Sequence, residues 1–261
     1  MELAEGLAAE FARLPGVRAV GVGGSLATGA ADDGSDIDLY VFADPAPAPA
    51  QRRAVMAATG GAIRADLDLS YWDPGDEWIH PSGIEVDIVL WTPAWVTGRM
   101  RSVLVEHRAE LGYTTCFWHT MRSLVPLADD GWLASLRAWV DVPYPEQLAR
   151  NIVARNHPLL RGSIPAYSNQ LAKAVGRGDA ISVNHRLAAL LASYFDIVFA
   201  ANRVPHPGEK RLVAQARGSC SSLPERFEDD LATVLAADSG QVLARVEALL
   251  DHLDAWLAAG S

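Results

Sequence analysis

The hydrophobic pattern of the chain changes from helical spacing to short alternating runs within its first hundred residues. Leu3, Leu7, Phe11 and Leu14 recur at the spacing of one helix face, which predicts a helix at the start of the chain. The short apolar or alternating runs that follow are typical of strands. The strands that this pattern predicts are Val17–Gly23, Asp36–Phe42, Ile63–Trp72 and Ile84–Trp91.

Proline and glycine separate these expected strands. Alternating prolines in residues 43–50 exclude both a helix and ladder pairing, so they predict an extended connector. Residues 51–59 favour a short helix. Pro74-Gly75 and Pro81-Ser82-Gly83 are turn signals, and we therefore expect residues 72–83 to form a loop.

From about Pro93 onward the alternation disappears and helical periodicity dominates. The helices that we expect there are Thr97–Leu111, Cys116–Leu127, Gly131–Trp139, Pro145–Leu160, Pro165–Arg177, Ala180–Ala201, Glu209–Ala216, Pro224–Ala236 and Gly240–Ala258. Short breaks join them, as in a helical bundle. The pattern predicts an α+β fold of two domains, with a mixed sheet in residues 1–95 and an all-α helical bundle in residues 96–261.

Composition limits the class of function. The 261 residues are 50% hydrophobic and 21% charged, which is ordinary for a globular protein. The formal net charge is −10, and this disfavours general nucleic-acid binding, because proteins bind nucleic acids by neutralising their phosphates. An acidic protein attracts a cationic small substrate more readily.

Neither membrane segments nor cysteine chemistry are evident. No apolar run approaches the roughly 18 residues that a membrane span needs. Residues 1–14 carry acids and no basic start, so we expect no signal peptide. Cys116 and Cys220 lack metal-ligand spacing, which favours two incidental thiols in a reducing compartment. We therefore expect a cytoplasmic protein.

Candidate chemistry begins where the first expected strand ends. Gly23-Gly24-Ser25 follows the apolar run, and a glycine pair lets backbone amides approach a phosphate closely. Asp36-Ile37-Asp38 opens the next strand, where side chains at i and i+2 point to the same face. Two carboxylates held that close repel each other unless a cation lies between them. The stretch therefore indicates a place for a metal and a triphosphate.

Asp87 would add a third carboxylate from a neighbouring strand. Residues 86–90 are otherwise apolar and predict a buried strand. An isolated carboxylate in such a strand costs several kcal/mol unless it is paired, bound to a metal or shifted in pKa. Hard oxygen ligands of this kind select Mg²⁺, which keeps substrate phosphates among its ligands.

In these features the chain resembles the nucleotidyltransferase superfamily that includes DNA polymerase β. The resemblance lies in Gly24-Ser25, Asp36-Ile37-Asp38 and Asp87, and it is clearest over residues 17–95. It implies in-line attack of a substrate hydroxyl on the α-phosphorus of a nucleoside triphosphate. It further implies that Asp36 and Asp38 bind Mg²⁺ and that Gly24 and Ser25 hold the β- and γ-phosphates. Asp87 would be either the third metal ligand or the general base.

The second half is similar to the helical domains of antibiotic adenylyltransferases, the aminoglycoside and lincosamide nucleotidyltransferases. The segment FDIVFAANRVPHPGEKR, from Phe195 to Arg211, resembles their helix–loop–helix, in which a lysine reaches the nucleotide phosphates. The resemblance implies that Lys210 is this lysine and that the helical domain closes the active site. The likeness is looser here, over residues 140–215.

Other acidic residues admit two interpretations. Asp66-Leu67-Asp68 repeats the Asp-x-Asp pattern, but no glycine–serine turn precedes it at the right distance, which favours a strand edge over a metal pair. Substrate binding by one of these two aspartates is the alternative. Glu77 and Trp78 favour a surface acid and a packing tryptophan, with contact to a cationic sugar as the alternative. Asp179 and Glu209 are each either an ordinary surface residue or a contact for a cationic substrate.

The sequence therefore predicts a Mg²⁺-dependent enzyme that transfers AMP from ATP, or another nucleoside triphosphate, to a hydroxyl of a small molecule. An aminoglycoside-like antibiotic is the expected acceptor, which would make antibiotic resistance the outcome. One alternative changes the acceptor to a protein side chain or an RNA end, although the acidic charge disfavours RNA. A third is a non-catalytic, antitoxin-like module that binds a partner.

Overall fold

The computed structural model describes residues 1–28, 35–71 and 73–260. Trp72, with which one expected strand ends, lies outside the described residues. The chain divides into two compact units. One unit contains Met1–Arg101 and Thr120–Val142, and the other contains Ser102–His119 and Pro143–Ser261.

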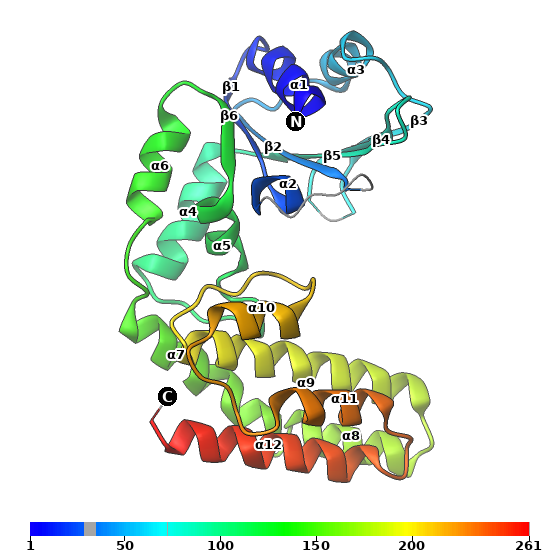
Figure 1. The fold of residues 1–261 in the computed structure, drawn as a ribbon, viewed down its shortest axis with the longest axis vertical. Helices are drawn as coiled ribbons and strands as arrows, with labels where there is room; N and C mark the ends of the chain where they lie inside the picture. The colour runs from blue at the N-terminus through cyan, green and yellow to red at the C-terminus, as the bar shows by residue number, and fades with distance from the viewer. Residues whose placement is uncertain (29–34, 72, 261) are drawn as a thin grey trace. The chain divides into compact units, whose positions relative to one another are not determined.

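The first unit is built on a six-stranded sheet (Figure 1). Its strands are β1 (Val17–Val22), β2 (Ile37–Ala43), β3 (Arg64–Leu69), β4 (Gly75–Ile79), β5 (Glu85–Trp91) and β6 (Val125–Asp129). They follow the order β3-β4-β5-β2-β1-β6, in which β2 and β5 are parallel and the other neighbours, within the described residues, are antiparallel. A parallel pair needs a crossover. The chain makes it through α3 (Pro49–Ala58), β3 and β4.

Helices α1 (Glu2–Ala12) and α3 cover one face of this sheet (Figure 1). Leu7 and Phe11 of α1 pack there with Leu39 of β2 and Ile88 of β5, and all four are fully buried. Because side chains alternate along a strand, the residues next to Leu39 and Ile88 face the opposite side. That side of β2 and β5 holds the carboxylates of the candidate site.

Strand β4 contradicts the expected loop over residues 72–83. Trp78 is 3% exposed and packs in the core beneath the sheet. Asp76 faces the same core, where its Oδ1 accepts a hydrogen bond from Nη1 of the buried Arg52 at 2.6 Å. This contact joins β4 to α3 across 24 residues. Turn signals in the sequence mark the two ends of the strand and conceal the strand between them.

Strand β6 contradicts the helix expected over Cys116–Leu127. Helix α5 (Cys116–Ser123) stops early, and Val125 then pairs with Val22 of β1. The segment 120–142, which also contains α6 (Trp132–Val140), returns to the first unit. It lies beyond the single boundary that we expect near residue 95. The helix that we expect to start at Thr97 begins earlier, at Pro93, as helix α4 (Pro93–Leu104).

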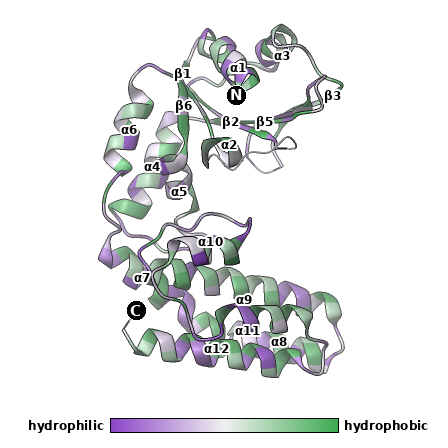
Figure 2. Cartoon of the chain, in the orientation of Figure 1, coloured by the Kyte–Doolittle hydropathy of each residue, from purple (hydrophilic) through white to green (hydrophobic). Residues whose placement is uncertain are grey.

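The second unit is helical, and the α+β fold class is confirmed. Its helices are α7 (Glu146–His157), η1 (Pro158–Gly162), α8 (Tyr167–Gly176), α9 (Ala180–Ala201), α10 (Leu212–Ser219), α11 (Phe227–Ala236) and α12 (Val242–Ala258). Tyr194 and Ile197 of α9 pack in its core with Leu249 and Leu253 of α12. Figure 2 shows α9 and α12 banded in hydrophobic and hydrophilic colours, as expected for helices with one buried face. Within the described ranges, no helix combines the length and hydrophobicity that crossing a membrane requires.

A buried polar network holds the segment before α5 against α7 and α9. Asp196, which is 1% exposed, accepts hydrogen bonds from the backbone N–H and the hydroxyl of Thr114 at 3.0 and 2.6 Å. Asn156 also donates to Asp196, at 3.3 Å, and accepts from the backbone N–H of Gly112. Burial raises the pKa of Asp196 to about 7, against the lowering effect of its donors.

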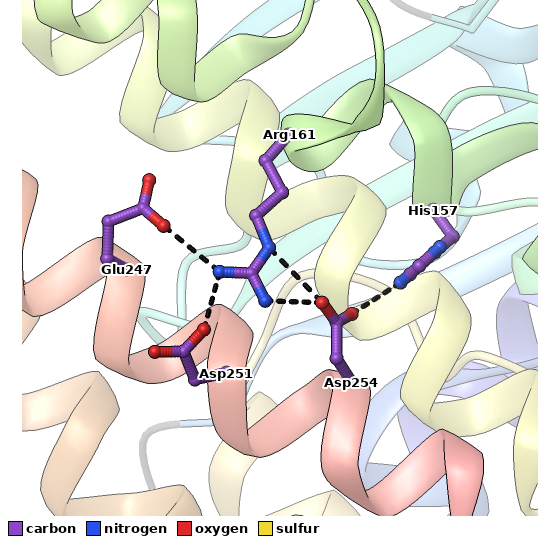
Figure 3. A network of polar contacts seen from close by, with 5 residues as sticks. All are labelled: His157, Arg161, Glu247, Asp251 and Asp254. Carbon is purple, nitrogen blue, oxygen red and sulfur yellow. Dashed lines mark hydrogen bonds and ion pairs between the residues drawn. The ribbon is translucent and has the colours of Figure 1, made fainter.

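A charged network joins η1 to α12 (Figure 3). Nη1 of Arg161 donates to Glu247 at 3.0 Å and to Asp251 at 2.7 Å, and the same guanidinium contacts Asp254. His157 lies 2.5 Å from the other oxygen of Asp254. Glu247, Asp251 and Asp254 lie at successive turns of α12, so one arginine is held along one helix face.

Asp196→Ala should lower the unfolding free energy by about 1–3 kcal/mol, because it leaves the buried donors of Thr114 and Asn156 without their acceptor. Urea unfolding near pH 7 measures the change. Glu225→Ala, which removes an exposed acid from the same unit, is the control and should change the unfolding free energy by less than about 0.5 kcal/mol. Equal stability of the two variants would contradict a stabilising role for the network.

Candidate active site

Gly24 lies against the carboxylate of Asp38 at the turn that follows β1. The Gly23 N–H donates to the Asp38 carbonyl at 2.9 Å, and α2 (Gly24–Thr28) begins at Gly24. The φ angle of Gly24 is +59°, and a Cβ at this position would lie 1.9 Å from Oδ2 of Asp38. Only glycine fits here, both for its φ angle and for the space that Asp38 occupies. The side chain of Ser25 and residues 29–34 lie outside what the structure describes.

Asp38 and Asp87 are direct neighbours on the parallel strands β2 and β5. Both are half-buried and alternate with core residues, so they lie on the face opposite α1 and α3. Asp36 immediately precedes β2 and is also half-buried. Asp36 and Asp38 lie near enough to Asp87 for their charges to raise its pKa, so the three carboxylates that the sequence predicts occupy one region of this face.

The row of carboxylates continues onto two further strands. Glu77 of β4 is the register partner of Asp87, and Asp66 of β3 is the register partner of Glu77. Asp38, Asp87, Glu77 and Asp66 therefore follow one another across four adjacent strands on one face. The sequence does not place Glu77 in this row because residues 72–83 carry turn signals. The alternation of Asp76, Glu77 and Trp78 is the signal that could have revealed the strand.

Asp87 lies in strongly unfavourable electrostatic surroundings. Burial, followed by the negative charges of Asp38, Glu77, Asp36 and Asp73 in that order, raises its pKa to about 6. A bound cation would offset this repulsion, because it favours the ionised form of every carboxylate around it.

The carboxylates border a cavity of about 440 Å³ on the same face of the sheet. Its apolar and aromatic lining residues include Leu69, Tyr71 and Val89. Its acidic lining residues in the described part of the chain are Asp66, Asp73, Asp76, Glu77 and Asp87. A cavity of this size, adjacent to reactive carboxylates, admits a small organic molecule.

The donor chemistry of Asp36, Asp38 and Asp87 fits Mg²⁺, which prefers carboxylate oxygens and keeps other positions for water and phosphates. In their present positions, no three acidic, histidine or cysteine side chains of the described residues converge on one point that would hold a metal. Asp36, Asp38 and Asp87 would hold such a metal, whose charge would offset the repulsion that raises the pKa of Asp87.

The second Asp-x-Asp pair is held in ion pairs. Asp66 contacts Nη2 of Arg64 at 3.0 Å, and Asp68 contacts Nη2 of Arg52 at 2.8 Å. Asp68 also has a φ angle of 62°, which places it at an irregularity in the pairing of β3 with β4. These contacts account for both carboxylates without a metal.

Lys210 belongs to the second unit, where it is exposed in the turn before α10. Glu209 precedes it in the same turn. Asp179 caps α9, since its Oδ1 accepts the backbone N–H of Ser182 at 3.0 Å. This hydrogen bond, with a second from the Ser182 hydroxyl, lowers the pKa of Asp179. An N-cap accounts for Asp179 without a substrate.

Asp87→Asn should stabilise the metal-free protein at about pH 7.5 and have little effect near pH 4. The folded-state pKa of about 6 lies above the ordinary value of 3.8, so the folded state holds an extra proton between these pH values. The contribution of Asp87 to the unfolding free energy is therefore highest below about pH 4 and falls as the pH rises through about 6. The amide of Asp87→Asn does not ionise, so the unfolding free energy of this variant lacks the decrease.

Thermal unfolding in EDTA across this pH range measures the difference. Asp44→Asn, which removes an exposed carboxylate just beyond the other end of β2, is the matched control and should follow the wild-type curve. A constant difference between Asp87→Asn and the wild type at all pH values would contradict the raised pKa.

Comparison with known proteins agrees with this geometry. The sequence model of the nucleotidyltransferase domain family matches residues 4–110. No curated protein matches the sequence significantly. Similar solved structures include a nucleotidyltransferase-like protein from Exiguobacterium sibiricum 255-15, with 12% identity and a TM-score of 0.47 over 97% of this chain and 73% of that one. Another is an aminoglycoside 6-adenyltransferase from Bacillus subtilis, with 10% identity and a TM-score of 0.34 over 99% of this chain and 92% of that one.

Both TM-scores lie below 0.5, so the family match carries the assignment. It spans β1 to β5, including the turn at Gly24 and the neighbouring Asp38 and Asp87. The resemblance seen in the sequence is thereby confirmed at the level of the superfamily. Residues 4–110, which contain the turn at Gly24 and the carboxylates of β2 and β5, match the nucleotidyltransferase domain family.

Proposed function

We propose that this protein transfers AMP from ATP to a hydroxyl group of a small molecule, with Mg²⁺ as cofactor. The observation that carries the proposal is the register of Asp38 beside Asp87, with Gly24 packed against Asp38, in a nucleotidyltransferase domain. An aminoglycoside-like antibiotic is the acceptor that we propose, and the cytoplasm, which supplies ATP and Mg²⁺, is the location.

The donor side of the site is the turn after β1 together with the start of β2. We assign Asp36, Asp38 and Asp87 to Mg²⁺ and Gly24 and Ser25 to the β- and γ-phosphates. When bound, Mg²⁺ supplies positive charge at the phosphate oxygens, where negative charge accumulates in the reaction. Gly24 contributes a close backbone approach, because any side chain there would displace Asp38.

The acceptor side is the cavity beside Asp87. Its acidic lining and the net charge of −10 favour an acceptor that carries amino groups, since the field of the protein attracts a cation. Leu69, Tyr71 and Val89 offer apolar contact for the body of such a molecule. These features support a small cationic acceptor over an RNA end, whose phosphates the same field would repel.

A panel of aminoglycosides and lincosamides, incubated with the protein, ATP and Mg²⁺, should contain at least one compound that gains the mass of one AMP. Mass spectrometry detects the product, and pyrophosphate release confirms the stoichiometry. A panel without any product would remove the antibiotic interpretation. Labelling of lysate protein or RNA by radioactive ATP would then favour the alternative acceptors, and absence of ATP binding would favour the non-catalytic alternative.

Asp36→Asn should abolish AMP transfer while the far-UV circular dichroism and thermal midpoint stay near wild type. The amide cannot supply the negative oxygen that a Mg²⁺ ligand provides. Asp44→Asn, at the other end of the same strand, is the matched control and should keep the wild-type rate. Full activity of Asp36→Asn would show the metal assignment to be wrong.

Lys210→Gln should raise the KM for ATP roughly tenfold, the effect expected when one charge-assisted contact to phosphate is lost. The resemblance to the antibiotic adenylyltransferases supports this role for Lys210. Lys173 is exposed on α8 and is the other lysine of the chain, so Lys173→Gln is the matched control. Equal KM values for the two variants would refute the assignment of Lys210 to the triphosphate.

A further inference from the structure

We propose that Glu77 is the general base that takes the proton of the acceptor hydroxyl, an inference that rests on the function proposed above. In the sequence analysis, Asp87 is the candidate for the general base, as an alternative to its role as the third metal ligand. The structure offers a second carboxylate next to Asp87, on a strand that the sequence does not predict. Asp87 is then free to serve as the third metal ligand.

The order of the strands separates the two substrates. The turn with Gly24, which we assign to the triphosphate, lies on the β1 side of Asp38. The cavity lies on the β4 side of Asp87. Register partners on antiparallel strands have Cα atoms about 4.5–5.5 Å apart, so Glu77 stands one strand beyond Asp87 toward the cavity. An acceptor hydroxyl that approaches from the cavity therefore reaches Glu77 beside the proposed metal ligands.

The other acidic residues of the cavity are engaged elsewhere. Asp66 contacts Arg64, and Asp76 contacts the buried Arg52 on the opposite face of β4. Asp73 accepts a hydrogen bond from the indole N–H of Trp91 at 3.0 Å.

Glu77 is exposed, and its carboxylate makes no hydrogen bond or ion pair within the described part of the chain. A general base needs an oxygen that is available to accept a proton. Among the acidic cavity residues other than the proposed ligand Asp87, Glu77 alone has neither carboxylate oxygen engaged in a hydrogen bond or ion pair within the described residues.

The ion pair behind β4 fixes the position of Glu77. Asp76 is the preceding residue, and its Oδ1 accepts hydrogen bonds from Arg52 at 2.6 Å and from the backbone N–H of Asp68 at 2.8 Å. Arg52 and Asp76 are 3% and 1% exposed. These contacts hold β4 against α3 and β3, so Glu77 projects from a supported strand rather than from a loop.

The acceptor oxygen forms a bond to the α-phosphorus of ATP, and the bond from that phosphorus to the oxygen that bridges it to the β-phosphorus breaks. Pyrophosphate leaves with the electron pair of the broken bond. The hydroxyl proton passes to the carboxylate of Glu77 and from there to water.

Glu77→Gln should lower kcat roughly 10²–10⁴-fold, the usual contribution of a general base, and should leave the affinity for Mg²⁺·ATP within about twofold of wild type. Glu77→Asp, which keeps the carboxylate, should retain more activity than Glu77→Gln. Glu85→Gln removes an exposed acid from the neighbouring strand outside the cavity lining, and it should behave as wild type. Calorimetry measures Mg²⁺·ATP binding. Initial rates of pyrophosphate release are measured with an aminoglycoside acceptor from the panel, or with water if the panel contains no acceptor.

Three results would overturn the assignment. A wild-type kcat in Glu77→Gln excludes a base. An unchanged kcat with a raised KM for the aminoglycoside shows a substrate contact instead, and loss of Mg²⁺·ATP affinity shows a metal ligand. Failure of the proposed function is distinct from all of these, because the wild-type protein would then release no pyrophosphate with any acceptor, and the base assignment would fall with it.

Discussion

Repulsion between Asp38 and Asp87 is the constraint on which the rest of the site depends. The parallel pairing of β2 and β5 places these carboxylates side by side, and burial with the surrounding charges raises the pKa of Asp87 to about 6. The fold holds them there because Leu39 and Ile88, next to them in sequence, are fully buried on the other face. A slip of one residue would turn the carboxylates into the core. The arrangement is costly without a cation and favourable with one.

The crossover between β2 and β5 links the two sides of the site. A parallel pair cannot be joined by a tight turn, and here the connection contains α3 and the β3–β4 hairpin. The hairpin pairs with β5 and so extends the sheet beyond Asp87. It brings Glu77 and the cavity to the edge of the carboxylate row. The same connection therefore makes Asp38 and Asp87 neighbours and contributes residues to the cavity beside them.

The parts of the site that the sequence predicts depend on local patterns. Alternation in β2 and β5 shows which face Asp38 and Asp87 share, and Gly24 marks the turn beside them. Strand β4 is missed because its stability comes from contacts distant in sequence, above all the pair of Asp76 with Arg52. Strand β6 is missed because Val125 pairs with a strand about a hundred residues earlier, whereas helical periodicity is a local signal.

The proposed site requires that the carboxylates of β2 and β5 hold a divalent cation together with the nucleotide. Mn²⁺, a common stand-in for Mg²⁺, gives an electron paramagnetic resonance signal that weakens when the ion is bound. In the presence of a non-hydrolysable ATP analogue, the wild-type protein should remove this signal stoichiometrically, and Asp38→Asn should leave it at the level of nucleotide alone. Equal binding by the wild type and Asp38→Asn would contradict the account.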